Sequence, residues 1–246
     1  MELGAQIIEG KTKIVYAHPD DAALCVLAHK DGITAGDGVR RNEIPGKGAL
    51  AGRTTANVFR LLECAGVATH FIAAPAPTLT VARCCTMLPL EVVMRRLATG
   101  SYLRRNPEVA EGTRFDPLLV EFFLKDDAAH DPLITPTEIA ERTLATPAEL
   151  EQMVTTGCQV FAILETAWAK LEVTLVDLKL EFGRLPSGAL IVADVIDNDS
   201  WRIWPAGEKS RMLDKQVYRN AALVDDALLA AVYARYAQVA DLTDQF

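Results

Sequence analysis

Two strand-like segments in the second half of the chain, 173–182 and 189–196, constrain the fold more than any other part of the sequence. Alternate side chains of a strand point to opposite faces of its sheet. In the first segment one face is mostly apolar, and the other carries Asp177, Lys179 and Glu181. The second segment is almost entirely apolar, which predicts a strand buried on both faces. We therefore expect an antiparallel hairpin that presents a row of charges.

One carboxylate interrupts the apolar second segment. Asp194 lies inside it, and burying a lone carboxylate is costly unless it is paired or binds a metal. If the connection spans 183–188 and Phe182 lies opposite Ala189, Glu181 and Asp194 share one face of the hairpin. Two carboxylates there predict a hard oxygen site that suits Mg²⁺. Two alternatives remain open, namely a structural ion pair of Asp194 with the lysine of the first segment, and a solvated outer face.

The N-terminal sequence Gly10-Lys11-Thr12-Lys13 predicts a contact with phosphate. It is not a Walker A motif, because five residues instead of four separate Gly4 from Gly10, and a strand is expected to follow. Glycine in a turn between two short strands lets the backbone approach a nucleotide. Lys11 and Lys13 would point to the same face, which is the logic of the glycine-rich loop of kinases.

A second candidate anion site surrounds Gly100. One serine and four arginines lie close to it in the sequence: Arg95, Arg96, Ser101, Arg104 and Arg105. Guanidinium groups bind phosphate oxygens in a planar, often bidentate geometry. The cluster therefore predicts a phosphate site, with a solvated basic turn as the alternative. The residues alone assign no role to the charged loop that contains Lys125 and Asp131.

The order of the expected elements predicts an α+β protein of two lobes that share a cleft. Thr135 and Thr146 each begin a capping box with proline at the first helical position. The glycine-rich stretch 31–48 predicts a long loop. Helices are expected over 49–65, from Thr146 to about 171, and over 223–242, and strands within 6–16 and over 23–29, 69–73, 78–85, 90–98 and 118–124.

The composition excludes several classes of partner. With 25 Lys+Arg against 33 Asp+Glu and no basic run, the chain is a poor binder of nucleic acids and anionic membranes. The first residues lack the regions of a signal peptide, and the longest uncharged stretch, 64–82, contains two prolines, so no membrane span is expected. Five cysteines without a Cys-x-x-Cys spacing argue against disulfides and metal clusters and indicate a reducing cytoplasm.

Several of these segments, taken in order, resemble the phosphoribosylaminoimidazole-succinocarboxamide synthase (SAICAR synthetase) family. The matching stretches extend from Glu9 to Arg219 and are EGKTKIVY, DGITAGDG, EIPGKGAL, MLPLEVVMRRLATGSYLRRNP, FFLKDDAAHDPLI, LVDLKLEFG, VADVIDNDSWRIWP and DKQVYR. The resemblance implies a two-lobed fold related in plan to ATP-grasp enzymes and kinases, with ATP in the cleft between the lobes. We expect residues 1–88 to form a β-rich nucleotide-binding lobe and residues 89–246 an α/β lobe for substrate and metal.

The activity implied by the resemblance is a cytoplasmic ligase reaction of purine biosynthesis. ATP, L-aspartate and carboxyaminoimidazole ribonucleotide (CAIR) would give SAICAR, ADP and phosphate, with Mg²⁺ as cofactor. A carboxylate resists attack by an amine, so ATP would first convert it to an acyl phosphate. A homo-oligomer is possible. Two alternatives remain open, namely a kinase-like phosphotransferase acting on another small molecule, and an inactive relative that serves as a binding protein.

The resemblance also implies roles for individual residues. Asp177 and Lys179 match positions at the imidazole and carboxylate end of the ribonucleotide, and Asp37 matches a segment near the substrates; these three form the expected catalytic set. Positions for the ribonucleotide and its phosphate, or otherwise near the substrates, are matched by Arg95, Ser101, Arg202, Asp199, Lys125 and Asp131. Positions for ATP are matched by Lys11, Lys13, Met87, Glu91, Glu181 and Asp194, of which Glu181 and Asp194 would also bind Mg²⁺.

Overall fold

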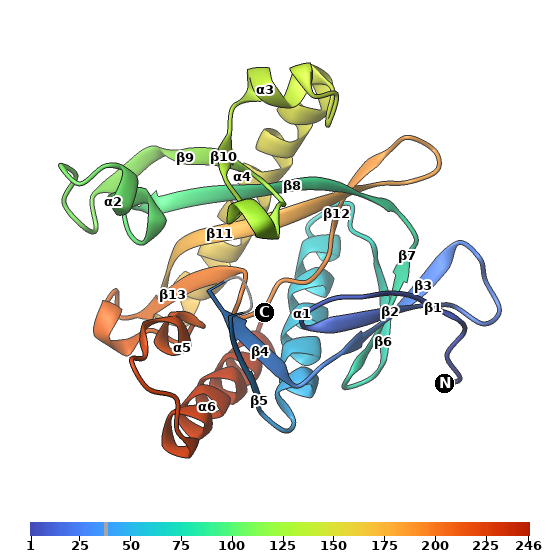
Figure 1. The fold of residues 1–246 in the computed structure, drawn as a ribbon, viewed down its shortest axis with the longest axis horizontal. Coiled ribbons are helices and arrows are strands. Elements are labelled where there is room, and N and C mark those ends of the chain that lie inside the picture. Colours follow the sequence, from blue (N-terminus) through green and yellow to red (C-terminus); the bar gives the residue numbers. More distant parts are fainter. Residues whose placement is uncertain (37–38) are drawn as a thin grey trace.

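The first of two large sheets contains the N-terminal strands. The computed structural model describes residues 1–36 and 39–246. Figure 1 shows the helix α1 (Lys47–Cys64) against this sheet. The two strands expected within 6–16 are present and flank Gly10 as predicted. The strands are antiparallel in the order β1 (Gln6–Glu9), β2 (Lys13–Ala17), β3 (Leu24–His29), β7 (Leu79–Arg83) and β6 (Phe71–Ala76).

The second sheet is built around one long strand, β11 (Val173–Arg184). One edge of β11 pairs with β8 along most of its length, and the other edge pairs with β13 near the start and with β12 near the end. The order is β10 (Leu133–Ile134), β9 (Arg114–Leu124), β8 (Thr86–Leu97), β11 and β12 (Leu190–Ala193), with β13 (Trp201–Pro205) also paired to β11. The strand expected from the charge alternation is therefore present, and it lies inside the sheet, whereas β12 of the apolar segment lies at the end of the order.

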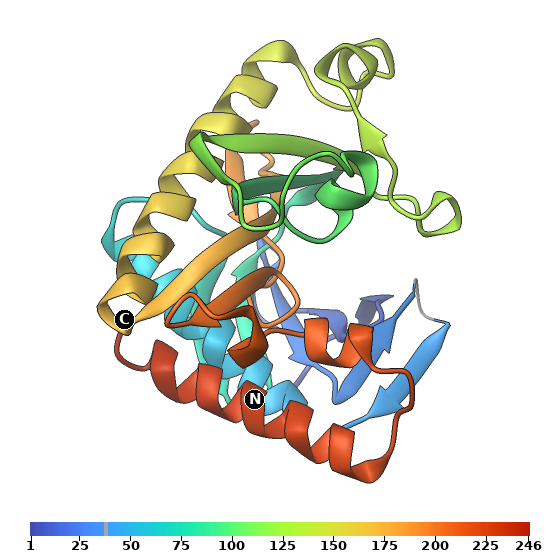
Figure 2. The same ribbon diagram turned by 90° about the vertical axis from the view of Figure 1, so that its left-hand side faces the viewer.

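Helices connect and cover the two sheets. In Figure 2, α4 (Pro147–Lys170) runs along the second sheet and α6 (Asp226–Thr243) crosses below α1. The shorter helices are α2 (Ser101–Arg105), α3 (Pro136–Glu141), α5 (Gln216–Asn220) and the 3₁₀ turns η1 (Asp127–Ala129) and η2 (Lys209–Arg211). None of the described helices is long and apolar enough to cross a membrane.

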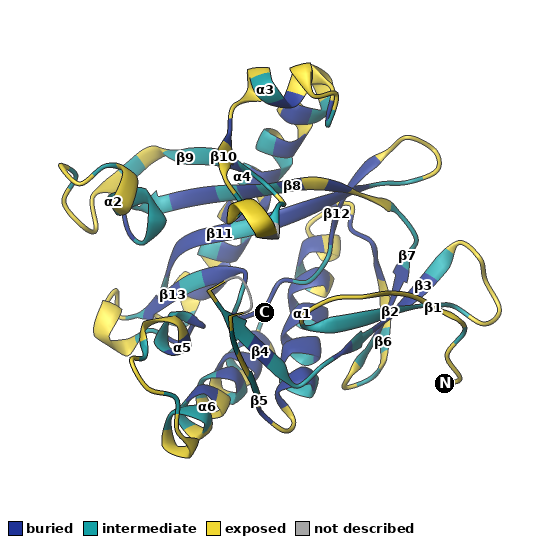
Figure 3. Cartoon of the chain, viewed as in Figure 1, coloured by how far each residue is buried: buried dark blue, intermediate teal, exposed yellow. Residues whose placement is uncertain are grey.

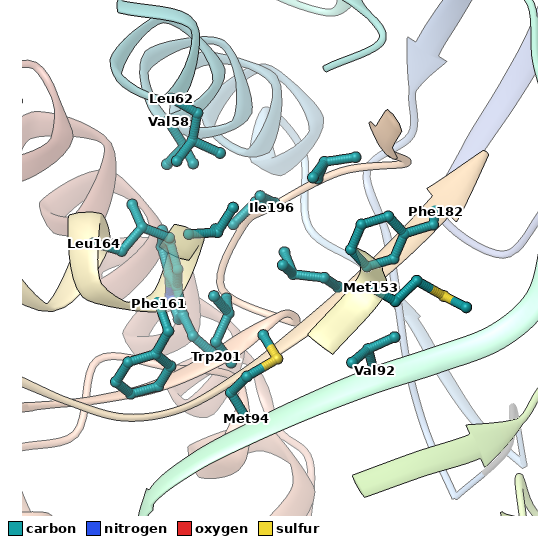
Figure 4. Packing of buried hydrophobic residues seen from close by; sticks show 14 of the residues in the cluster. Val58, Leu62, Val92, Met94, Met153, Phe161, Leu164, Phe182, Ile196 and Trp201 are labelled. Atoms are coloured by element: carbon teal, nitrogen blue, oxygen red, sulfur yellow. The ribbon is translucent and has the colours of Figure 1, made fainter. Parts of the chain in front are cut away.

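The main hydrophobic core joins the two sheets through α1. Val58 and Leu62 of α1 share one buried cluster with Leu164 of α4 and with Ile196 and Trp201. Figure 4 shows these side chains converging, and Figure 3 shows that the facing parts of α1, α4 and β11 are buried. Because apolar residues of both sheets pack in one cluster, the position of one sheet relative to the other is set by this core.

The stretch expected to be a long loop, 31–48, contains a hairpin, so that prediction was wrong. β4 (Gly32–Ala35) pairs with β5 (Arg40–Glu43), and Gly36 has a φ of 56° where the chain turns. Contacts distant in sequence hold the hairpin, because Arg40 donates hydrogen bonds to the backbone oxygens of Tyr218 and Ala221 at 2.9 and 2.8 Å. The glycine content of 31–48, on which the loop prediction rested, carries no information about these distant contacts.

The predicted register of the hairpin 173–196 was also wrong. Glu181 lies opposite Ala193, and Phe182 lies opposite Val192 instead of Ala189. The connection is shorter than the expected 183–188, because β11 extends to Arg184. It closes with a hydrogen bond from the Leu185 nitrogen to the Ala189 oxygen at 2.9 Å.

Both predicted capping boxes are present. Thr146 accepts a hydrogen bond from the Glu149 nitrogen at 3.2 Å, and Glu149 accepts one from the Thr146 nitrogen at 2.8 Å. Thr135 and Glu138 form the same pair of bonds at the start of α3. These local signals define where α3 and α4 begin.

We predict that Thr146→Ala lowers the free energy of unfolding by about 1 kcal/mol, because α4 loses its N-cap acceptor. Thr155→Ala is the matched control, since Thr155 is exposed in the interior of the same helix and alanine favours a helix more than threonine. Urea unfolding should show destabilisation only for the first variant. Equal effects of the two substitutions would contradict the role of the capping box.

Candidate active site

A cavity of about 1370 Å³ is lined by residues from both sheets and from the β4–β5 hairpin. The turn between β1 and β2 contributes Lys11, the start of β2 contributes Lys13, and β8 contributes Met87 and Glu91. The cavity therefore brings together all six residues predicted to bind ATP: Lys11, Lys13, Met87, Glu91, Glu181 and Asp194. Four more predicted site residues line it as well: Lys125, Asp131, Lys179 and Asp199.

Lys179 lies at the centre of a charged array in this cavity. Its Nζ donates hydrogen bonds to Glu181 Oε1 at 2.7 Å and to Glu91 Oε1 at 2.9 Å. Lys125 forms an ion pair with the other oxygen of Glu181. Although burial disfavours the charged ammonium, the carboxylates of Glu181 and Glu91 raise the pKa of Lys179 well above its usual value. Lys179 therefore keeps its charge at neutral pH.

Asp194 is paired with Lys13 and not with Lys179, so the structural ion pair considered from the sequence is not formed between these described residues. Burial disfavours the charged carboxylate, but Lys13 and Lys179 together lower the pKa of Asp194 below its usual value. The side chain is therefore ionised at neutral pH. Its partner Lys13 comes from the first sheet, which makes this ion pair a contact between the two halves of the cavity.

Glu181 and Asp194 line the same cavity although the predicted register was wrong. Alternation along β12 would send Asp194 to the face opposite Glu181, because Glu181 lies opposite Ala193. β12 ends at Ala193, and Asp194 has a left-handed backbone with a φ of 66°. Aspartate is among the few residues that adopt this region with some frequency. The left-handed backbone at Asp194, and not the strand register, therefore brings the two carboxylates into the same cavity.

The carboxylates of Glu181 and Asp194 fit the requirements of Mg²⁺ only together with further oxygen ligands. Both are hard oxygen donors in a cavity that is also lined by five lysines: Lys11, Lys13, Lys30, Lys125 and Lys179. Among the residues that the structure describes, no group of three or more His, Cys, Asp or Glu side chains could hold a metal ion. Mg²⁺ commonly binds through one or two carboxylates and completes its octahedron with phosphate oxygens and water.

The predicted phosphate-binding arginines meet around Asp177, outside the residues that line the large cavity. On β11, Asp177 lies directly opposite Arg95 of β8 on one side and Arg202 of β13 on the other. Arg95 donates to Asp177 Oδ2 at 3.0 Å and to Ser101 Oγ at 3.2 Å, and Arg202 forms an ion pair with the same oxygen of Asp177. Directly opposed residues on neighbouring strands share a face, so one carboxylate orients both guanidinium groups.

Gly100 allows the close approach of Arg202 to this cluster. A Cβ added at Gly100 would lie 2.6 Å from Arg202 Nη2, and the φ of 58° at Gly100 disfavours other residues. The expected catalytic residue Asp37 lies outside the described residues.

Residues without a predicted role also contribute to the site. Lys215 and Arg219, both at α5, pair with the predicted site residue Asp199 at 2.5 and 2.6 Å. Lys47 and Asp197 line a smaller cavity beside the large one. Lys47, Lys215 and Arg219 belong to the motifs EIPGKGAL and DKQVYR. Their position in these motifs was the available signal, but a lysine or arginine in a loop is usually solvated.

Comparison with known proteins identifies the family. The family model described as SAICAR synthetase matches residues 6–230. The chain belongs to the SAICAR synthetase family. A phosphoribosylaminoimidazole-succinocarboxamide synthase of Chloroflexus aggregans is 72% identical over 100% of this chain and 98% of its own length. A bifunctional phosphoribosylaminoimidazole carboxylase/succinocarboxamide synthetase of Drosophila melanogaster is 46% identical over 98% of this chain, which corresponds to 57% of that relative.

Solved structures of this family have the same fold. The synthase of Ehrlichia chaffeensis superposes with a TM-score of 0.89 at 31% identity and covers 98% of this chain and 99% of its own. A SAICAR synthetase in complex with ADP superposes with a TM-score of 0.83 at 33% identity, over 94% of this chain and 97% of its own. The predicted α+β fold of the SAICAR synthetase type is therefore confirmed.

Proposed function

We propose that this SAICAR synthetase joins CAIR to L-aspartate, converts ATP to ADP and phosphate, and so serves purine biosynthesis. Membership of the family supports this activity. The structural observation that carries it is the single cavity lined by all six residues expected to bind ATP. The relatives favour this ligase over the two alternatives, a phosphotransferase for another substrate and an inactive binding protein.

We infer that ATP lies in the large cavity, with its phosphates at Lys11 and Lys13 and its adenine beside Met87 and Glu91. The volume of about 1370 Å³ is sufficient for a nucleotide together with a second substrate. The structure of a relative in complex with ADP supports nucleotide binding in this fold. In this proposal residues 1–88 form the nucleotide-binding lobe, and residues 89–246 form the lobe for substrate and metal.

Glu181 and Asp194 would hold Mg²⁺ together with phosphate oxygens of ATP. The bound ion would neutralise charge on the transferring phosphoryl group. Lys125 and Lys13 already lie against these carboxylates and supply positive charge to the same place.

Lys179 would orient the carboxylate of CAIR, because its ammonium is held between Glu91 and Glu181 and remains charged. A carboxylate oxygen would attack the γ-phosphorus of ATP, ADP would leave, and an acyl phosphate would form. The amine of L-aspartate would then attack the acyl carbon, lose a proton and expel inorganic phosphate. Most of the acceleration would come from positioning and from fixed charges.

We propose that the phosphate of the ribonucleotide binds at Arg202, Ser101 and Arg95. Asp177 would position the two guanidinium groups through the ion pairs described above. Asp199, Lys125 and Asp131 line the large cavity and are proposed as further substrate contacts. The role of Asp37 stays a prediction.

The free cysteines bear on the cellular setting that we propose. All five cysteines are free thiols, which supports our proposal of a reducing, cytoplasmic location. The homo-oligomer stays a prediction.

An ADP-release assay with each substrate omitted in turn tests the proposed activity. We predict sustained ADP release only when ATP, CAIR and L-aspartate are all present. Sustained release without L-aspartate would instead support the phosphotransferase, and no release from the complete mixture would support the inactive binding protein.

We predict that Arg202→Ala weakens CAIR binding about 10- to 150-fold, because a charge-assisted hydrogen bond to phosphate is lost. ATP affinity should stay within about twofold, since Arg202 does not line the large cavity. Calorimetric titration measures both. Arg114→Ala is the matched control, because Arg114 is an exposed arginine at the start of β9, and its loss should leave both affinities unchanged. A comparable loss of ATP affinity in the Arg202 variant would contradict this assignment and indicate that Arg202 binds the nucleotide.

A further inference from the structure

Lys47, at the start of α1, has a buried side chain with no hydrogen-bond or ion-pair partner among the described residues. Its exposed fraction is 2%. The ammonium makes no hydrogen bond or ion pair with any residue in 1–36 or 39–246, and its recorded contact is with the ring of Tyr236, whose centroid lies 5.4 Å away. Burial lowers the pKa of Lys47, while Asp197 and Asp199 act in the opposite direction. A buried ammonium without a partner is costly, so its presence indicates a ligand.

The Lys47 side chain lines a cavity of about 90 Å³ beside the large one. Lys13, Lys179, Asp194 and Asp199 line both cavities, so the two adjoin. The other three lysines of the small cavity already have carboxylate partners: Lys13 pairs with Asp194, Lys179 with Glu91 and Glu181, and Lys215 with Asp199. Among its described lining residues, Lys47 is therefore the lysine with an unused charge.

The charges around this cavity suit a small molecule that has both a carboxylate and an amine. Lys47 offers a cation at one place, and Asp197 and Asp199 offer carboxylates close by. The small volume fits the smallest of the three substrates better than a nucleotide. The phosphates of the other two substrates have basic residues of their own: Arg95 and Arg202, and Lys11 together with Lys13, which lies at the boundary of the two cavities.

We propose that Lys47 binds a carboxylate of L-aspartate in this small cavity. The amino group then points toward Asp199, at the boundary with the large cavity, where the activated carboxylate of the ribonucleotide is formed. This assignment rests on the proposed function. It adds a binding residue for the amino-acid substrate, and it explains why the fold keeps an ammonium that forms no ion pair with any described carboxylate.

The test is the variant Lys47→Met, which keeps much of the side-chain volume and removes the charge. The KM for L-aspartate should rise about 10- to 150-fold, as expected for the loss of a hydrogen bond between charged groups. The dissociation constants of ATP and CAIR should stay within about twofold, which also shows that the variant is folded. Lys170→Met is the matched control, because Lys170 is exposed at the end of α4, and it should leave all three values unchanged.

Thermal unfolding without ligands provides a second readout. Removing an unpaired buried charge should leave the melting temperature of Lys47→Met equal to or higher than that of the wild type. A purely structural role for Lys47 predicts a lower melting temperature and an unchanged KM for L-aspartate, and that pair of results would overturn the proposal. Weaker binding of ATP or CAIR with an unchanged KM for L-aspartate would also overturn it, because Lys47 would then serve one of those substrates.

Succinate, a dicarboxylate without an amine, separates this proposal from the proposed function. Its binding to the protein with ADP present can be measured by calorimetry without turnover. We expect binding to the wild type that weakens about 10- to 150-fold in Lys47→Met. Equal binding by both proteins would contradict the role of Lys47 even if the wild type is an active ligase. A wild type that binds succinate through Lys47 but shows no aspartate-dependent ADP release would contradict the ligase function alone.

Discussion

The structure depends on one strand, β11, which pairs with β8 on one edge and with both β13 and β12 on the other. One of its faces belongs to the core that joins the two sheets, where Leu178 and Leu180 are almost fully buried. Its other face carries Asp177, Lys179 and Glu181 two residues apart. Because neighbouring strands present their opposed residues on the same face, Asp177 meets Arg95 and Arg202. Lys179 reaches Glu181 along its own strand and Glu91 diagonally on β8. β11 therefore determines both the packing of the core and the geometry of the site.

Charge compensation across the cavity explains how so many ionised groups remain close together. Lys179 is held by Glu91 and Glu181, and Asp194 is held by Lys13 from the opposite sheet. Each of these groups is partly removed from water, which is costly unless an opposite charge is near. Nucleotide phosphates would replace the carboxylates beside the lysines, and Mg²⁺ would replace the lysines beside the carboxylates. No buried charge would then lack an opposite charge nearby. We infer that the array is prepared for anionic substrates before they bind.

Local signals in the sequence predicted the elements, whereas contacts distant in sequence decided the details. The helix starts at Thr135 and Thr146 and the alternation along β11 were predictable because neighbouring residues determine them. The β4–β5 hairpin was not, because Arg40 reaches Tyr218. The left-handed backbone at Asp194 left no trace in the pattern of apolar residues, so the register was predicted wrongly. Lys47 resembles a solvated lysine until the placement of Tyr236 on α6 shows its burial.

Transfer of carboxylate oxygen tests most directly the claim that this site activates a carboxylate with ATP. CAIR labelled with heavy oxygen in its carboxylate would be converted to SAICAR with unlabelled ATP and L-aspartate, and the inorganic phosphate would be analysed by mass spectrometry. The acyl phosphate route predicts one labelled oxygen in each phosphate released, because that oxygen leaves with the phosphoryl group. Unlabelled phosphate during normal turnover would contradict the activation of the carboxylate in this cavity.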